Sequence, residues 1–254
     1  MPANVPASGA QPQGTATEQG ASDAVQSMFN EIAPRYDLLN HILSANIDRL
    51  WWWRTARCFR PILHNPEAAI VDLCCGTGDM TLALLRHRPQ NGQPVLAIDF
   101  AHEMLVRAQK KFSTHGNGTG AITIEADALA MPLDDDTAHL LTIAFGFRNL
   151  ANYAAGLREI YRVLRPGGQV GILDFSQPDG ITGKLYQFYF RRVLPRVGTW
   201  LSGSAGPYAY LPQSVHRFPP PCEMQAMMAA TGFQNISWTP YTFGIAGLYR
   251  AVKP

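Results

Sequence analysis

The sequence predicts an α/β fold with a seven-stranded, mostly parallel sheet, helices on both faces and an antiparallel C-terminal hairpin. Two observations lead to this prediction. Short apolar runs of strand length alternate with amphipathic runs of helical length between residues 68 and 175, which is the pattern of βαβ units with right-handed crossovers. In addition, the first apolar run stops abruptly at Gly76-Thr77-Gly78, before a helical pattern begins at Met80. Glycines allow such a sharp turn because they adopt backbone angles that other residues avoid.

Five apolar runs have the composition of strands buried in a parallel sheet. They cover residues 68–73, 94–98, 121–125, 140–145 and 170–175. Amphipathic helices are expected between them at residues 80–87, 101–112 and 154–164. Pro166-Gly167-Gly168 is expected to end the last of these helices and to form the loop before the fifth strand. A further helix closed by Gly232 precedes the two runs that form the hairpin, residues 233–238 and 243–252.

We expect a disordered tail at residues 1–22 and a single domain at residues 23–254. The tail contains small and polar residues, which bury too little apolar surface to offset the entropy of ordering. A helical cap at about residues 24–60 contains Trp51-Trp52-Trp53, and neighbouring side chains on a helix point about 100° apart. Either two of these tryptophans pack inward and one is exposed, or one lines an apolar pocket or a membrane-facing entrance.

An aromatic insertion interrupts the α/β pattern at about residues 180–215, and its first half is expected to be helical. It combines tyrosine, phenylalanine and tryptophan with Arg191, Arg192 and Arg196. Such a segment either caps the core or lines an apolar channel at a bilayer surface, where the arginines would favour anionic lipid. The sequence does not separate these two interpretations.

The composition excludes several classes of function. The 254 residues carry a net charge of only +2 and no basic run, so no nucleic-acid partner is expected. The four cysteines form neither a CxxC pair nor a Cys/His cluster, so we expect reduced thiols and no metal. A signal peptide and a membrane-spanning run of roughly 20 apolar residues are both missing. These observations favour a cytoplasmic protein that can lie on a membrane but does not cross it.

The glycine turn favours a nucleoside ligand over a dinucleotide. The dinucleotide fingerprint Gly-x-Gly-x-x-Gly would place its third glycine where this chain has Thr81. An acid able to bind ribose does follow about 20 positions later, at Asp99, and Asp127 after the next strand can accept from an adenine amino group. This combination suits S-adenosylmethionine better than NAD. The alternative interpretations are a helix cap for Asp99 and an ordinary loop acid for Asp127.

Two further expectations concern residues close to this turn. Asp72 lies inside the first strand and is expected to orient the glycine turn without a catalytic role. Arg107, Lys110 and Lys111 fall on the solvated side of the helix at residues 101–112, where no function is expected.

Several motifs of the α/β region resemble those of class I S-adenosylmethionine-dependent methyltransferases. Residues 72–79 are similar to their first motif, Asp99 to their ribose acid and residues 166–168 to their loop before strand five. Residues 28–40, with Asp48, Arg49 and Trp52, resemble the N-terminal signature of the UbiE/MenG quinone C-methyltransferases. Further matches to that family lie at residues 145–150, 208–214, 227–228 and 232–233, so the resemblance runs from about residue 25 to residue 253.

The resemblance implies a Rossmann-like class I methyltransferase fold that binds S-adenosylmethionine. It implies a prenylated quinol as acceptor, with demethylmenaquinol as the first candidate and the polyprenyl benzoquinol precursor of ubiquinone as the second. It places Thr77, Asp99, Asp127 and Ala128 at cofactor-contact positions. Independently of the resemblance, the main chain at Gly76 and Gly78 is expected to approach the methionine part of the cofactor. There are two departures from the family: Ala144 stands where a serine near the cofactor is common, and Tyr249 stands where many members have histidine.

Methylation of a ring carbon requires a nucleophilic carbon next to a hydroxyl that loses its proton, in a site that excludes water. Arg148 is expected to stabilise that oxygen as a fixed cation, with Asn149 as a second donor. Tyr36 and Asp37 are candidates for closing the site, and a carboxylate there could relay the proton. The alternative interpretation of Arg148 is an ordinary surface ion pair, and no general base is identified.

Other hypotheses stay open beside the quinol reaction. The chain could methylate a different acceptor, such as a sterol or a phospholipid amine, or it could bind S-adenosylmethionine as a non-catalytic module that regulates a partner. A fourth hypothesis, an NAD-dependent oxidoreductase, is disfavoured by Thr81. The sequence is compatible with a homo-oligomer and with peripheral contact at the inner face of the cytoplasmic membrane.

Overall fold

The computed structural model describes residues 8–37, 44, 46–115, 120–178, 183 and 206–254. Their core is a seven-stranded sheet in the order β3-β2-β1-β4-β5-β7-β6. The strands are β1 (Ile70–Leu73), β2 (Val95–Asp99), β3 (Ala121–Glu125), β4 (Ala138–Ala144), β5 (Leu164–Phe175), β6 (Gln234–Tyr241) and β7 (Ala246–Val252). The first five are parallel, and β7 runs antiparallel to both β5 and β6. The predicted fold class is therefore confirmed, including its C-terminal hairpin.

The strand order reverses at β1, which pairs with β2 on one side and with β4 on the other. Leu73 is in register with both Ile98 and Ile143, so the three strands end at the same level. A crevice forms at such a reversal because the segments that leave the strands diverge to opposite faces of the sheet. The carboxyl ends of β1, β2 and β4 are thus the place where a ligand is expected.

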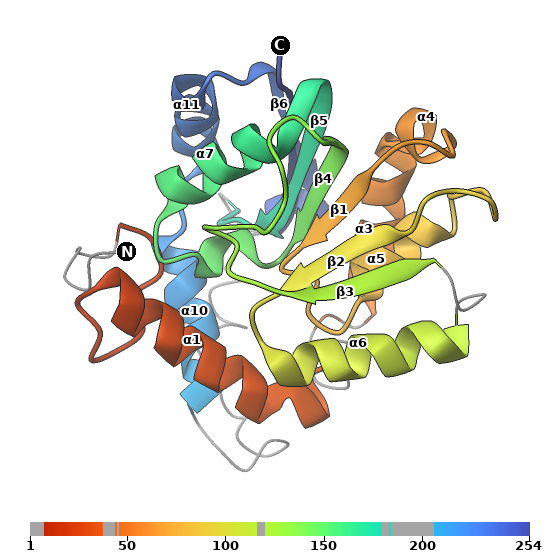
Figure 1. The fold of residues 1–254 in the computed structure, drawn as a ribbon. Coiled ribbons are helices and arrows are strands. Elements are labelled where there is room, and N and C mark those ends of the chain that lie inside the picture. The colour runs from red at the N-terminus through yellow and green to blue at the C-terminus, as the bar shows by residue number, and fades with distance from the viewer. Residues whose placement is uncertain (1–7, 38–43, 45, 116–119, 179–182, 184–205) are drawn as a thin grey trace.

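Helices cover both faces of the sheet because successive strand residues point to opposite sides. Ile70 and Leu140 pack with α3 (Ile47–Cys58), α4 (Arg60–Leu63) and α5 (Asp79–Leu85). Their neighbours Val71 and Leu141 point the other way and pack with α7 (Tyr153–Val163) and α11 (Pro221–Thr231). These two helices lie side by side in Figure 1, and α6 (His102–His115) packs against β2 and β3.

One predicted boundary is wrong. α7 ends at Val163 and β5 begins at the next residue, so Pro166-Gly167-Gly168 lies inside β5 and not in a loop before it. The pairing with β4 shifts register between Ala138 and Leu140 to accommodate the extra residues. Gly167 takes a positive φ of 78° at this irregularity. Proline and glycine therefore mark a bulge-like interruption within the strand.

The N-terminal region is more ordered than its composition suggests. α1 (Glu18–Ile32) begins inside the expected tail, because the Thr17 side chain caps it by accepting from the N–H of Gly20 at 3.1 Å. The N–H of buried Ala10 donates to the carbonyl of Leu150 at 2.8 Å. α1 then packs beside α6 and α10 (Gly206–Arg217), as Figure 1 shows. Residues 8–22 therefore do not form the disordered tail that we expected.

The three successive tryptophans divide as the first interpretation predicts. Trp51 is buried, Trp52 is half-buried, and Trp53 is exposed. Most of the expected aromatic insertion, including residues 184–205 and their three arginines, lies outside the described residues, and the end of the insertion belongs to α10. None of the helices in the described ranges is both long and apolar enough to cross a membrane.

Candidate active site

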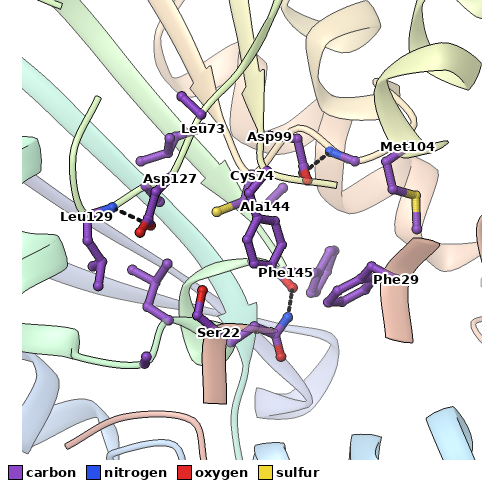
Figure 2. A pocket seen from close by; sticks show the side chains of 18 of the residues that line it. Ser22, Phe29, Leu73, Cys74, Asp99, Met104, Asp127, Leu129, Ala144 and Phe145 are labelled. Carbon is purple, nitrogen blue, oxygen red and sulfur yellow. Dashed lines mark hydrogen bonds between the residues drawn. The ribbon is translucent and has the colours of Figure 1, made fainter. Parts of the chain in front are cut away.

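A pocket opens at the carboxyl edge of the sheet and contains about 680 Å³ of empty space, part of which is open to solvent. The segments that follow β1, β2, β3 and β4 form its wall, and α1 and the residues after it contribute Ser22, Phe29 and Tyr36. Figure 2 shows Asp99 and Asp127 from two of these segments around the same space. The carboxyl ends of the parallel strands therefore bring these two acids to the same pocket.

The predicted site residues divide into those that line the pocket and those that do not. The lining residues are Gly76, Asp99, Asp127, Ala128, Tyr36 and Asn149. Thr77 and Gly78 belong to the same turn but do not contribute to the wall, and neither do Asp37 and Arg148. The positions of Asp37 and Arg148 are fixed by ion pairs that the sequence does not indicate.

The glycine turn uses its two glycines for different purposes. Gly76 has a φ of 54°, and a Cβ placed on it would meet no atom within 4 Å, so this part of the main chain is open to a ligand. Gly78 has a φ of 89°, and a Cβ there would lie 2.5 Å from the ring of Phe112. Gly76 therefore permits close approach to the pocket, whereas Gly78 permits α5 to pack against α6.

Asp72 of β1 links the start of α5 to β4 next to the glycine turn. Its carboxylate is completely buried and accepts hydrogen bonds from the hydroxyls of Thr81 at 2.6 Å and Thr142 at 2.8 Å. Burial raises the pKa of Asp72 to about 7. The residue that replaces the third glycine of a dinucleotide loop thus has a structural purpose, because Thr81 ties α5 to β1.

Asp99 ends β2 and faces the pocket. One of its oxygens accepts from the N–H of Gly76 at 2.8 Å, and the other accepts from the N–H of Ala101 at 2.9 Å. Burial raises the pKa of this carboxyl to about 6, although these main-chain donors oppose the rise. The contact with Ala101 is the cap-like interaction of the alternative interpretation. Each oxygen can accept more than one hydrogen bond, so both hydroxyls of a ribose can still bind.

Asp127 and Ala128 follow β3 on the adjacent side of the pocket. One Asp127 oxygen accepts from the N–H of Leu129 at 2.9 Å, which orients the carboxylate within its own turn. Ala128 is buried and presents a small apolar surface to the same space. An adenine ring placed here would meet an acceptor for its amino group and an apolar face.

Arg148 is buried, so its interpretation as a surface ion pair is wrong. It lies in a short 3₁₀ turn, η2 (Phe147–Asn149), after β4. Its guanidinium donates to Asp174 of β5 at 3.0 Å and to the carbonyl of Phe145, and its main-chain N–H donates to the other Asp174 oxygen at 3.0 Å. The guanidinium also lies 5.2 Å from the ring centre of Phe175. Burial raises the pKa of Asp174, and the charge of Arg148 opposes this rise.

Two polar atoms where the pocket wall meets the η2 turn are buried and have no hydrogen-bond partner among the described residues. They are Nε of Arg148 and Oδ1 of Asn149. The amide nitrogen of Asn149 donates to the carbonyl of Phe145 at 3.4 Å, and Phe145 itself has a positive φ of 59°. Buried polar atoms without partners and a strained non-glycine residue are both typical of ligand sites. Ala144, which lines the pocket next to Phe145, offers no hydroxyl.

Asp37 takes part in an ion-pair network behind the glycine turn. Its carboxylate accepts from the Thr77 hydroxyl at 2.5 Å and pairs with Lys111 at 2.8 Å. Lys111 also pairs with Asp79 at 2.8 Å and donates to Thr77 at 3.1 Å. This network joins the end of the N-terminal region to α5 and α6. Asp37 therefore joins two parts of the site and does not itself line the pocket.

The expectation that Lys111 is solvated and without function is wrong on its first point. The Lys111 side chain is only 16% exposed. A signal for this was present, because Lys111 follows Met104 by seven positions and Ala108 by three, and both of those belong to the buried stripe of α6. No comparable pattern in the sequence indicates that Asp174 is the partner of Arg148.

Comparison with known proteins supports the assignment of the fold. Residues 16–253 match the model of the ubiE/COQ5 methyltransferase family. A demethylmenaquinone methyltransferase of Thermus thermophilus is 45% identical over 89% of this chain and 100% of its own length. The ubiquinone/menaquinone biosynthesis C-methyltransferase UbiE of Geobacter sulfurreducens is 40% identical over 93% of this chain and 90% of its own length.

A solved structure shares the architecture at much lower identity. A SAM-dependent methyltransferase from Aquifex aeolicus aligns with a TM-score of 0.54 at 17% identity and covers 77% of this chain and 93% of its own. That similarity concerns the fold alone. The match to the family model and the relatives at 40% identity or more concern the sequence as well, and they cover almost all of it. The chain belongs to the ubiE/COQ5 methyltransferase family.

Proposed function

We propose that this chain transfers a methyl group from S-adenosylmethionine to a ring carbon of a prenylated quinol. Demethylmenaquinol is the first candidate acceptor, in keeping with the name of the Thermus relative. The observation that carries the proposal is the pocket at the carboxyl edge, where an open glycine turn, two acids and Asn149 line one space. Arg148, the residue before Asn149, is buried next to this wall. A metal has no part in this proposal, and the described residues contain no group of metal ligands.

The residues at one end of the pocket fit the cofactor. Asp99 would accept from the ribose hydroxyls, and Asp127 from the adenine amino group, with Ala128 against the ring. The main chain at Gly76 leaves room for the methionine part, and the buried Thr77 links the glycine turn to Asp37 and Lys111. When bound, S-adenosylmethionine supplies an electrophilic methyl group on a positively charged sulfur.

The residues at the other end fit the acceptor. A quinol carbon becomes nucleophilic when the neighbouring hydroxyl loses its proton, so the site must stabilise negative charge on that oxygen. Arg148 would do this through Nε, which has no other partner among the described residues, and Asp174 holds the guanidinium in place. Asn149 Oδ1 would accept from a hydroxyl of the quinol. Both atoms are buried, where such interactions are stronger than in water.

Tyr36 and Asp37 are assigned to closing the site. Tyr36 lines the pocket from the N-terminal side, and the neighbouring Asp37 is held by Lys111 and Thr77. Because both oxygens of Asp37 are occupied in this way, we assign it to positioning and not to proton relay. Closure by Tyr36 would keep water away from the sulfonium and from the activated quinol.

A second acceptor, the polyprenyl benzoquinol precursor of ubiquinone, is favoured by the Geobacter relative, whose name includes both pathways. A competition assay separates the two. The chain is incubated with labelled S-adenosylmethionine and equal amounts of reduced demethylmenaquinone and reduced demethylated benzoquinone precursor. Label in the naphthoquinone supports the first candidate, and label in the benzoquinone replaces it with the second. Cofactor binding without label in either quinol would contradict the proposal and favour another acceptor or a non-catalytic role.

A further inference from the structure

Large apolar side chains are exposed at one corner of the molecule. Leu50 and Trp53 of α3 are 49% and 42% exposed, and Phe243, between β6 and β7, is 84% exposed. Leu50, Trp53 and Arg57 follow one another at helical spacing, so they form one outward stripe. The helix that carries this stripe contacts the β6–β7 turn at Thr242–Gly244 and the residue before it. Trp51 donates to the Thr242 hydroxyl at 2.8 Å, and the Arg54 guanidinium lies 4.2 Å from the ring centre of Tyr241.

The backbone of this turn is strained in a way that displays Phe243. Thr242, Phe243 and Gly244 have successive positive φ angles of 45°, 57° and 86°. The hydrogen bond from Trp51 fixes the start of the turn, and the Ser176 hydroxyl donates to the Gly244 carbonyl at 2.5 Å. Strain of this kind persists only when neighbouring contacts enforce it, and it is concentrated at functional positions. An aromatic ring held outward at such a tip buries little apolar surface within the chain, so it is available to an external partner.

The charges around these side chains are positive. Residues 47–63 contain four arginines and a single acid, Asp48, which is buried. Arg57 lies 5.2 Å from the ring centre of Trp53. Throughout the ranges that the structure describes, none of these four arginines pairs with an aspartate or glutamate. Guanidinium groups beside exposed tryptophan and phenylalanine match the boundary between anionic headgroups and acyl chains.

The corner adjoins the pocket. Ala246, two residues after Gly244, pairs with Phe175 at the carboxyl end of β5. The ring centre of Trp51 lies 5.7 Å from that of Phe145, which lines the pocket. If the acceptor carries an isoprenoid tail, as the proposed function holds, a bilayer at this corner would place that tail next to the pocket.

We propose that Leu50, Trp53 and Phe243, with Arg54 and Arg57 around them, form a docking surface for a bilayer that contains anionic phospholipid. The apolar side chains enter the acyl boundary, and the arginines contact the phosphates. Docking is reversible, because the buried area is small and α3 remains packed on the sheet.

Co-sedimentation of the full chain with phospholipid vesicles tests the surface. The vesicles consist of phosphatidylcholine, with or without phosphatidylglycerol. We expect tighter partition into the anionic vesicles. Replacing the three apolar residues together, Leu50→Ser with Trp53→Ser and Phe243→Ser, should lower the partition coefficient at least about tenfold. Arg57→Gln should lower it about fivefold for anionic vesicles only.

The matched control is the double variant Val106→Ser with Ile122→Ser, because these residues are 46% and 49% exposed on α6 and β3. It should bind vesicles like the natural chain. The proposal would be overturned if the control and the triple variant lost vesicle binding equally. It would also be overturned if neither the triple variant nor Phe243→Ser alone lowered the partition coefficient. A chain that ignores vesicles but self-associates through this corner in sedimentation would overturn it as well. Thermal unfolding verifies that each variant is folded.

Enzyme assays separate this surface from the proposed function. With a short-tailed, water-soluble quinol, the triple variant should turn over like the natural chain. With a long-tailed quinol in anionic vesicles, its turnover should fall by the same factor as its partition. Vesicle binding through this corner by a chain that methylates neither quinol would support the surface and contradict the proposed function.

Discussion

The two ends of the pocket hold their polar groups in different ways. At the cofactor end, Asp99 and Asp127 are oriented by main-chain N–H groups, and two of these donors lie only two residues further along the chain. At the acceptor end, Arg148 and Asp174 come from different strand ends and orient each other inside the protein. Main-chain donors remain when a side chain is changed, whereas removing one partner of a buried ion pair leaves the other charge buried without compensation. Changes at the first end should therefore affect affinity, and changes at the second should affect both turnover and stability.

The largest effect is expected for Asp99→Ala. The change removes an acceptor for two ribose hydroxyls and leaves the N–H of Gly76 without its partner. Hydrogen bonds to a charged group contribute about 1.5–3 kcal/mol each, so cofactor affinity should fall about 100-fold or more. Titration calorimetry with S-adenosylmethionine measures it. Glu125→Ala is the control, since Glu125 is in register with Asp99 but exposed; a similar loss there would break the distinction.

At the acceptor end, Arg148→Gln should lower turnover about 100-fold, the usual cost of removing a group that stabilises a developing negative charge. Cofactor affinity should stay within a factor of about two, because Arg148 lies away from the cofactor end. The unpaired Asp174 should also lower the free energy of unfolding by about 3–5 kcal/mol.

The paired variant Arg148→Gln with Asp174→Asn separates these two effects. It should recover most of the stability, because no charge remains buried alone, but none of the turnover. Steady-state kinetics and denaturant unfolding give the two values. Recovery of turnover in the paired variant would show that Arg148 acts only through folding.

The pH dependence should have opposite signs for binding and for stability. Burial raises the pKa of Asp99 to about 6 and that of Asp72 to about 7, both above the ordinary 3.8. Cofactor affinity needs ionised Asp99 and should fall about tenfold from pH 7 to pH 5. These two carboxyls bind protons more tightly in the folded chain than in the unfolded chain. Their contribution to the free energy of unfolding therefore rises as pH falls from about 7 to about 4. Asp72→Asn should flatten this rise in unfolding experiments; a steeper rise would contradict it.

The smallest effect is expected for Lys111→Met. Losing the ammonium leaves Asp37 and Asp79 close together without a shared partner and loosens the N-terminal region over the pocket. Partly buried pairs contribute modestly, so cofactor affinity should fall about threefold to tenfold. Calorimetry and limited proteolysis near residue 38 measure the change. Lys110→Met, on the exposed side of the same helix, should change neither.

The placement of Gly76, Asp99 and Asp127 around one pocket could be predicted because its information is local. A strand ending in Gly76-Thr77-Gly78, with one acid after each of the next two strands, places these groups at one edge once the sheet is parallel. The acceptor end could not be predicted to the same depth. The burial of Arg148 and its pairing with Asp174 depend on the register between β4 and β5 and on the turn at Phe145, which no local pattern indicates. The low exposure of Lys111 depends on its ion pairs with Asp37 and Asp79, whereas a lysine usually faces water.

The central claim is that one pocket holds S-adenosylmethionine at its Asp99 end and a quinol at its Asn149 end, next to the buried Arg148. A single-turnover experiment tests it most directly. The full chain is loaded with S-adenosylmethionine bearing a CD₃ methyl group, mixed with reduced demethylmenaquinone and analysed by mass spectrometry and NMR. A CD₃ group on the ring carbon next to a hydroxyl, formed by the natural chain and about 100-fold more slowly by Arg148→Gln, is the predicted result. A quinone without CD₃, or equal rates for the two chains, would contradict it.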